Sequence, residues 1–361
     1  MCIYLYYDLF LLFSFLFLKK QDKKIFIVGA IFLFLLIAFR TSNVGGDTLN
    51  YSYFYENKNS IYGMLKSPGD DIEIAFVYFA RLCKLISPHY LFFQIAITAV
   101  SLIPLFILIY RHSNNKTASL LLFMTVNSTY AIFMGAERQI LAMGFIYIAI
   151  LLYEKRQNKY YYILSIIFFL LSLFTHSTSY ISIFILLICK YITISKRNYI
   201  IILVGSVIIS VFISQINLLS YFTSLNLPIS YKIDNYVKWN LNEQFALGAV
   251  LPLTILAILI ILIAKKEELK NIYLKSFIIG VTIFNIFSFF PLAFRMTTLL
   301  VSLGFIYIPT QIKAKRNFYY LLSVLIVLVF QSYRHYEHTL SDKIYRESGE
   351  RILPYSSVIF K

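Results

Sequence analysis

The sequence predicts an all-α polytopic membrane protein with about twelve transmembrane helices. Of its 361 residues, 59% are hydrophobic and only 14% are charged, and the mean hydropathy is +0.73. A soluble globule of this length cannot hide that much apolar surface, so a bilayer is the fitting solvent. Apolar runs of membrane length recur along the whole chain. We therefore expect one integral membrane domain over residues 1–361.

The predicted spans are apolar runs separated by short polar loops. The first run precedes its lysines and lacks both a basic start and a small-residue cleavage site, so it is predicted to be a helix rather than a cleaved signal peptide. The spans are expected at 3–18, 25–39, 90–110, 118–134, 139–153, 160–174, 178–190, 199–220, 246–264, 272–292, 296–312 and 318–333.

The formal net charge of +16 is concentrated in alternate loops. If the N-terminus lies outside, six inner loops hold 19 of the 33 Lys and Arg but only 4 of the 17 Asp and Glu. That asymmetry follows the positive-inside rule, so the basic charge does not indicate a nucleic-acid partner. The outer face then has a long loop, a medium loop and a tail, at 40–89, 221–245 and 334–361.

Charged residues at the ends of the spans share the outer side. Arg40 ends the second span, Glu137 and Arg138 separate the fourth from the fifth, His176 follows the sixth, and Arg295 begins the eleventh. Charges at membrane depth are costly and favour a functional role, and the planar guanidinium suits a phosphate. We expect an outer cavity that binds a lipid-linked phosphate or pyrophosphate. The alternative is that each arginine snorkels to the interface or pairs with a nearby acid.

A polar segment follows Arg40 and begins the long outer loop. Gly45 and Gly46 give the chain freedom to turn sharply at the membrane surface. Asp47 is either a catalytic or sugar-binding carboxylate, or the N-cap of a helix that starts at Thr48. The two roles of Asp47 are compatible.

The segment 72–86 predicts an amphipathic, interfacial helix within the long outer loop. Glu73 at its start either pairs with Arg81 or faces the cavity. Glu137 is expected to neutralise its neighbour Arg138.

His176 stands in the sequence Thr-His-Ser at a helix break. Histidine titrates near neutral pH and can act as a general base. The alternative is that His176 only satisfies backbone groups at the break.

Signatures of metal and nucleotide chemistry are missing from the sequence. There is no phosphate-binding P-loop, no His-Glu-x-x-His motif and no Cys/His cluster, and the three cysteines are far apart. We therefore expect no metal site and no cofactor.

Over nearly its whole length, the sequence resembles the EpsG family of bacterial exopolysaccharide and O-antigen polymerases, broadly of the Wzy type. The resemblance depends on the order and spacing of several motifs. These are Arg40-x4-Gly45-Gly46-Asp47-x3-Tyr51, Glu73, Glu137-Arg138-Gln139-x-Leu141-Ala142, His176-Ser177, Arg295 and Leu353-Pro354-Tyr355.

The resemblance implies a fold similar to the GT-C membrane glycosyltransferases, in a bacterial inner membrane with the active site facing the periplasm. It implies transfer of a glycan from undecaprenyl pyrophosphate to the non-reducing end of an incoming lipid-linked unit, without a nucleotide. Besides that oligosaccharide and membrane lipids, the implied partner is a chain-length regulator.

Combined with the resemblance, the residues divide by expected role. The pyrophosphate-binding candidates are Arg40, Arg138 and Arg295, with Arg81 a poorer one. Asp47 is the first choice for the catalytic base, followed by Glu73 and His176. The supporting residues are Gly45, Gly46, Tyr51, Glu137 and Gln139.

Other classes of membrane protein share some of these features. A flippase for the same lipid-linked oligosaccharide also needs many spans and cationic cavities, but internal repeats are expected of it and none is clear here. An O-antigen ligase performs nearly the same transfer, and only the family motifs separate it from a polymerase. A membrane acyltransferase would need a His-centred site near the inner face, where His112 stands alone.

Overall fold

The computed structural model describes residues 2–45, 47–57, 73–126, 132–215, 247–288, 293–312 and 356–358. Within these ranges the regular elements are helices, together with one isolated β-bridge, so the all-α prediction is confirmed there. The helices are α1 (Cys2–Phe17), η1 (Lys19–Gln21), α2 (Asp22–Ala38), α3 (Thr48–Glu56), α5 (Ile74–Ile86), α6 (Tyr90–His112), α7 (Lys116–Thr125), α9 (Glu137–Tyr153), α10 (Lys159–Leu173), α11 (Thr178–Tyr191), α12 (Lys196–Gln215), α15 (Leu247–Ile263), η2 (Glu268–Lys270), α16 (Ile272–Ile286) and α17 (Ala293–Ile312).

The chain divides into two compact units, and the division falls within α11. Unit 1 comprises Met1–Ile183 with Gln331–Lys361, and unit 2 comprises Phe184–Phe330. Each unit is described by itself below. That both belong to one membrane domain stays a prediction.

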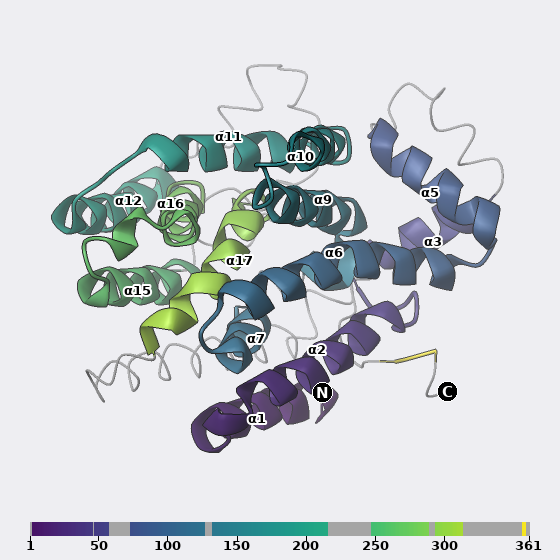
Figure 1. Ribbon diagram of the computed structural model, residues 1–361, viewed down its shortest axis with the longest axis horizontal. Coiled ribbons are helices and arrows are strands. Elements are labelled where there is room, and N and C mark those ends of the chain that lie inside the picture. The colour runs from purple at the N-terminus through teal and green to yellow at the C-terminus, as the bar shows by residue number, and fades with distance from the viewer. Residues whose placement is uncertain are drawn as a thin grey trace. The chain divides into compact units, whose positions relative to one another are not determined.

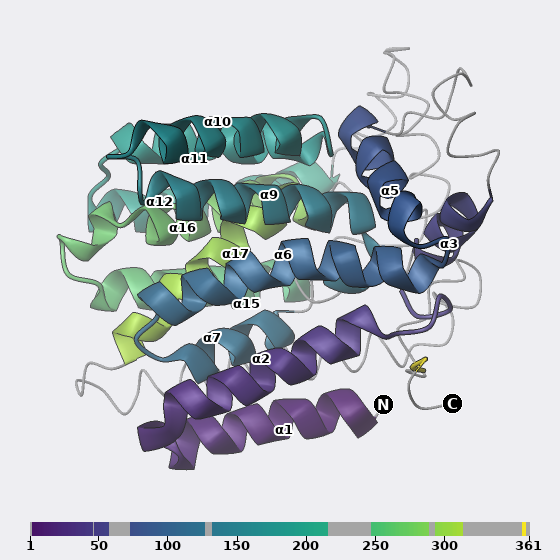
Figure 2. The ribbon, with the colours of Figure 1, turned by 45° about the vertical axis from the view of Figure 1, so that its right-hand side comes forward.

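Unit 1 is built around α6, which packs against α2 on one side and α9 on the other. Figures 1 and 2 show α1 beside α2, with α10 covering α9. The contact between α6 and α9 is unusually close at Gly144, where an added Cβ would lie 2.5 Å from the Val100 carbonyl oxygen. Glycine at this position lets the two helix backbones approach, as small residues do between membrane helices.

The surface of α10 has the polarity of a lipid-facing helix. Its buried residues are Ser165 and Ser172, and the Ser165 hydroxyl donates to the Ala149 carbonyl at 2.8 Å. Its exposed residues include large apolar side chains such as Ile163, Ile166 and Leu170. A water-facing helix would bury the apolar face instead, so this arrangement supports a membrane protein.

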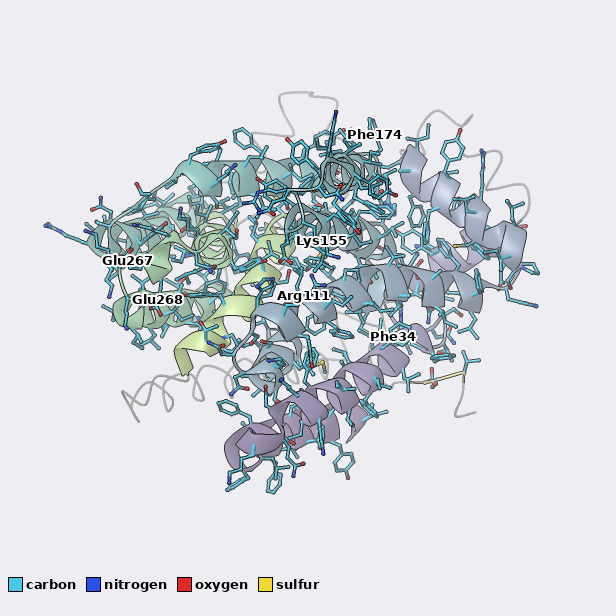
Figure 3. The ribbon with its side chains drawn as sticks, viewed as in Figure 1. Phe34, Arg111, Lys155, Phe174, Glu267 and Glu268 are labelled. Carbon is cyan, nitrogen blue, oxygen red and sulfur yellow. The ribbon has the colours of Figure 1, made fainter. Side chains whose placement is uncertain are left out.

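Loops predicted to lie inside contact one another at one end of unit 1. The Asp22 carboxylate accepts hydrogen bonds from the backbone N–H groups of Lys116 and Thr117 at 3.0 and 2.9 Å. Arg111, at the end of α6 (Figure 3), lies 3.3 Å from Glu154. Three predicted inner loops, those that follow α1, α6 and α9, therefore meet at the same end.

Asparagines begin three helices that follow predicted inner loops. The side chains of Asn115, Asn158 and Asn271 accept hydrogen bonds from the first turns of α7, α10 and α16, respectively. Asparagine is a preferred N-cap because its short side chain reaches these otherwise unpaired N–H groups. The caps fix where each helix starts.

Unit 2 contains α12, α15, α16 and α17. The α16 helix packs against α17 and α12, and α12 also packs against α15. Asn285, fully buried in α16, donates to Ser206 in α12 at 2.9 Å and to Thr254 in α15 at 2.8 Å. A shared amide of this kind ties three apolar helices together where water is excluded.

Eleven of the predicted spans overlap a described helix, and 318–333 lies outside the described residues. By length and composition, three of the described helices can cross a membrane, over Tyr90–His112, Lys196–Ile213 and Ala293–Thr310, and five more are apolar but shorter. The span predicted at 118–134 differs, because α7 ends at Thr125 and residues 132–135 form a separate short helical segment. The total number of spans stays a prediction.

Two helices occupy the described part of the long outer loop. The helix predicted over 72–86 is confirmed as α5, which buries Phe76, Val77 and Ala80 and exposes Leu82 and Leu85. Since the exposed face also carries large apolar groups, it suits an interfacial position. The loop at 221–245 and all of the tail except 356–358 lie outside the described residues.

Candidate functional site

The candidate site is built on two neighbouring residues at the start of α9, Glu137 and Arg138. Adjacent residues on a helix point about 100° apart, so the two side chains reach different partners. Glu137 pairs with Arg40, and Arg138 pairs with Glu73. The expectation that Glu137 neutralises Arg138 is therefore wrong, because each finds a partner from a distant segment.

The first pair is fully buried. Arg40 and Glu137 are each 1% exposed, and the Arg40 Nη2 lies 3.5 Å from the Glu137 Oε1. Arg40 also donates through Nε to the Val44 carbonyl at 3.1 Å, and through Nη1 to the Ile37 carbonyl. The Tyr90 hydroxyl donates to the same Glu137 oxygen. The ion pair and these hydrogen bonds offset part of the cost of burying the two charges. Within the described residues, the second Glu137 oxygen, Oε2, is buried without a hydrogen-bond partner.

The loop that follows Arg40 is held against the residues before α9. Gly45 has a φ of +111°, and a Cβ there would lie 1.9 Å from the Met134 carbonyl oxygen. The Thr48 hydroxyl donates to that same oxygen at 3.3 Å. The sequence-based expectation of a sharp turn is confirmed at Gly45, where the left-handed backbone and the close approach both require glycine. Gly46 lies outside the described residues.

The second pair is only half-buried and includes two further side chains. Arg138 donates through Nη1 to the Glu73 Oε2 at 2.9 Å and through Nε to the Tyr51 hydroxyl at 3.0 Å. The other Glu73 oxygen lies 3.0 Å from the His176 Nδ1. The sequence left open whether Glu73 pairs with Arg81 or faces the cavity. In the structure Glu73 forms an ion pair with Arg138 and a hydrogen bond with His176.

Four segments of unit 1 contribute to this half-buried cluster, which we call the Arg138 cluster: Tyr51, Glu73, Arg138 and His176. Tyr51 comes from α3, Glu73 stands directly before α5, Arg138 is in the first turn of α9, and His176 precedes α11. A backbone hydrogen bond from Ala75 N–H to the Phe174 carbonyl, at 3.0 Å, holds the Glu73 and His176 segments together.

The charges of the Arg138 cluster are set by its contacts. Burial acts to raise the pKa of Glu73, but the hydrogen bond from His176 and the charge of Arg138 outweigh it and lower that pKa to about 2. Burial raises the pKa of the Tyr51 phenol to about 12, with Arg138 opposing and Asp47 adding to the rise. Near neutral pH, Glu73 is therefore ionised and Tyr51 is protonated.

The remaining candidates lie in different surroundings. Asp47 stands at the N-cap position of α3, as the capping hypothesis requires, but its side chain makes no capping hydrogen bond. Gln139 is buried in α9, and the Arg81 guanidinium lies over the Tyr78 ring at 5.5 Å. Arg295 belongs to the first turn of α17 in unit 2. The Leu353-Pro354-Tyr355 motif lies outside the described residues.

Two residues of the site were missed by sequence reasoning. Tyr90 bonds to Glu137, and the Gln94 amide donates to the carbonyls of Ala38 and Arg40, at 2.9 Å each. Both lie in the first turns of α6, one helical turn apart, which places them on the same helix face. A polar residue four positions after a tyrosine in an otherwise apolar span was the available signal.

Within the described ranges, no group of three or more His, Cys, Asp and Glu side chains is arranged to hold a metal ion.

The Arg138 cluster combines two chemical capabilities. A half-exposed guanidinium can bind a phosphate oxygen and stabilise negative charge that develops on it. Because ionised Glu73 can only accept hydrogen bonds, the His176 Nδ1 must donate to it, which leaves Nε2 of the neutral ring as a proton acceptor. A cation and an imidazole that can accept a proton when neutral therefore contact the same carboxylate.

Comparison with known proteins gives one match. The sequence profile of the EpsG family matches residues 23–357, nearly the whole chain. No curated protein and no solved structure matches the chain.

Proposed function

The chain belongs to the EpsG family of Wzy-type polymerase-like proteins, and from this premise we propose that it polymerises lipid-linked oligosaccharide repeat units. The family and the apolar helices support membrane-bound polysaccharide biosynthesis in general. In the proposed reaction, the growing glycan leaves undecaprenyl pyrophosphate and joins the non-reducing end of an incoming unit. The proposed place is the periplasmic face of a bacterial inner membrane, on a fold similar to the GT-C glycosyltransferases.

The observation that carries the proposal is the Arg138 cluster. The Arg138 side chain is 29% exposed, whereas that of Arg40 is 1% exposed, so Arg138 is the arginine of this pair that a ligand can reach. In the proposal, Arg138 binds the pyrophosphate of the donor. As the bond between the anomeric carbon and the pyrophosphate oxygen breaks, negative charge grows on that oxygen, and a fixed guanidinium stabilises it.

His176 is the proposed general base. The acceptor hydroxyl attacks the anomeric carbon, its proton passes to the His176 Nε2, and the leaving pyrophosphate takes the bonding electrons. A direct displacement of this kind inverts the anomeric centre. Glu73, ionised and 3.0 Å from the Nδ1, orients the ring and stabilises its positive charge. Asp47 stays an alternative base.

The other candidates have supporting roles in the proposal. Arg40 holds Glu137, and with it the start of α9, in place through the buried ion pair. Arg81 is a further cation for the donor, and Arg295, in unit 2, stays a separate candidate for pyrophosphate binding. The reaction as proposed uses no nucleotide and no metal, since the pyrophosphate leaving group supplies the driving force. A chain-length regulator is the proposed protein partner.

The experiment is a gene deletion followed by size resolution of the surface glycan. We expect the deletion strain to carry at most single repeat units, and expect the wild-type gene to restore the ladder. Loss of even the single repeat from the surface would indicate a flippase or a ligase. Long chains retained on undecaprenyl pyrophosphate would identify the ligase, and an unchanged ladder would contradict the proposal.

A further inference from the structure

The 356–358 segment pairs with the residues that lead from α2 into the site. Thr41 N–H donates to the Ser356 carbonyl at 3.0 Å, and Val358 N–H donates to the Phe39 carbonyl at 2.9 Å. These two bonds form an antiparallel bridge between Arg40 and Ser357. The bridge joins parts of the chain that are more than 300 residues apart in sequence.

Side chains reinforce this backbone pairing. The Ser357 hydroxyl donates to the Phe39 carbonyl at 3.0 Å, and the hydroxyls of Thr41 and Ser356 are hydrogen-bonded to each other. Each residue of 356–358 therefore contributes a contact to the short stretch 39–41. Because two of these contacts use only backbone atoms, they depend on N–H and C=O groups more than on side-chain identity.

The stretch 38–41 is held from a second direction by α6. The Gln94 amide donates to the Ala38 and Arg40 carbonyls at 2.9 Å each. Gln94 and the 356–358 segment together satisfy the carbonyls of 38–40 and the N–H of Thr41. Polar backbone groups at the end of a membrane helix need such partners, because lipid offers none.

We propose that the 356–358 segment is a positioning element of the site. It fixes the backbone on both sides of Arg40, so that the Arg40 guanidinium meets Glu137 at the start of α9, where Arg138 follows. It also fixes the beginning of the loop that runs through Gly45 to Asp47. The inference rests on the proposed function, since the reaction being positioned is glycan transfer.

Val358→Pro is the discriminating variant. Proline lacks the N–H that donates to the Phe39 carbonyl, whereas Val358→Ala keeps it and shortens a side chain that is already 41% exposed. At equal amounts of protein in the membrane, we expect Val358→Pro to make at least about tenfold less polymer, because displaced catalytic groups lose rate steeply. Val358→Ala is expected to stay within about twofold of wild type.

A disulfide between positions 41 and 356 is expected to restore the activity that Val358→Pro loses. Thr41→Cys with Ser356→Cys replaces two side chains that touch, so the pair is expected to cross-link without a reductant, as mass spectrometry of the linked peptide would show. Adding the cysteine pair to Val358→Pro should restore polymer length when oxidised and lose it again when reduced. A segment that only adds stability would not give this reversible recovery of activity.

The outcomes separate this inference from the proposed function. If the cysteine pair does not cross-link in the protein with native Val358, the pairing of 356–358 with 39–41 is overturned, whatever the activity of that protein. Full polymer length in Val358→Pro, with the ladder lost in Arg138→Ala, overturns the positioning role and leaves the proposed function intact. A full ladder in both variants overturns the positioning role and also excludes the Arg138 cluster as the site of the proposed reaction, whereas a full ladder in the deletion strain overturns the proposed function itself.

Discussion

At the scale of single residues, Glu73 links the two chemical parts of the Arg138 cluster. One carboxylate oxygen faces Arg138 and the other faces His176. The lowered pKa of Glu73 has a consequence for stability, because it shows that the ionised form is favoured in the folded protein.

The stabilisation from Glu73 should disappear in acid. It is fully present above the ordinary glutamate pKa of 4.5 and is lost as the pH falls toward the folded value of about 2. We expect wild type to lose thermal stability between about pH 5 and about pH 2 more steeply than Glu73→Gln, which carries no such charge. Melting curves of both purified proteins over this range would check it, and parallel curves would contradict it.

Gly45 has a matched control in Gly205. Gly45→Ala forces a side chain into a left-handed backbone and against Met134, so we expect a loss of about 1–3 kcal/mol in unfolding free energy. Gly205 has no neighbouring atom within 4 Å of an added Cβ, and Gly205→Ala should be neutral or stabilise α12 by about 0.5–1 kcal/mol. Equal melting temperatures for both variants would refute the strained turn.

At the scale of elements, hydropathy predicted most helices because a membrane span must be continuously apolar. The exception was α7, which ends at Thr125 although apolar residues follow. Hydropathy averages over a window of residues, so it does not locate where a helix ends within an apolar run.

Asp22 shows how one element can fix another. It begins α2, yet its carboxylate accepts from the first two N–H groups of α7. We expect Asp22→Ala to lower the free energy of unfolding by about 1–2 kcal/mol. Asp22→Asn should lower it distinctly less, because asparagine keeps one acceptor oxygen. Unfolding experiments on the purified variants would measure this loss of free energy. The cap would be disproved by an Asp22→Ala protein as stable as wild type.

At the scale of the whole molecule, the side of the membrane on which each loop lies stays a prediction. In unit 1, three of the predicted inner loops contact each other, and four of the predicted outer residues, Arg40, Glu137, Arg138 and His176, meet partners in the site. The partners within the site were not predictable, because Arg40 with Glu137, and Glu73 with Arg138 and His176, are separated by long stretches of chain. Sequence alone gives the residue types at each helix end but not the angle at which each helix presents them.

The orientation can be tested with single cysteines. Asn57, at the end of α3, and Val358, paired with Phe39, are exposed, and Lys20 and Arg156 are exposed in loops predicted inside. In a background without native cysteines, a membrane-impermeant maleimide should label Cys at 57 and 358 in intact spheroplasts. It should label Cys at 20 and 156 only after permeabilisation. The opposite pattern would mean that the orientation is the reverse of the predicted one. Labelling of positions 57 and 358 on different sides of the membrane would contradict the bridge between Arg40 and Ser357.

The most direct measurement uses purified protein in lipid nanodiscs with lipid-linked repeat units as the only substrate. Wild type should release undecaprenyl pyrophosphate and lengthen the glycan, with no nucleotide added. Arg138→Ala should lose at least about a hundredfold in rate. Arg111→Ala, whose ion pair with Glu154 lies at the other end of unit 1, should stay within about twofold. Equal rates for the two variants would contradict the assignment of glycan transfer to the Arg138 cluster.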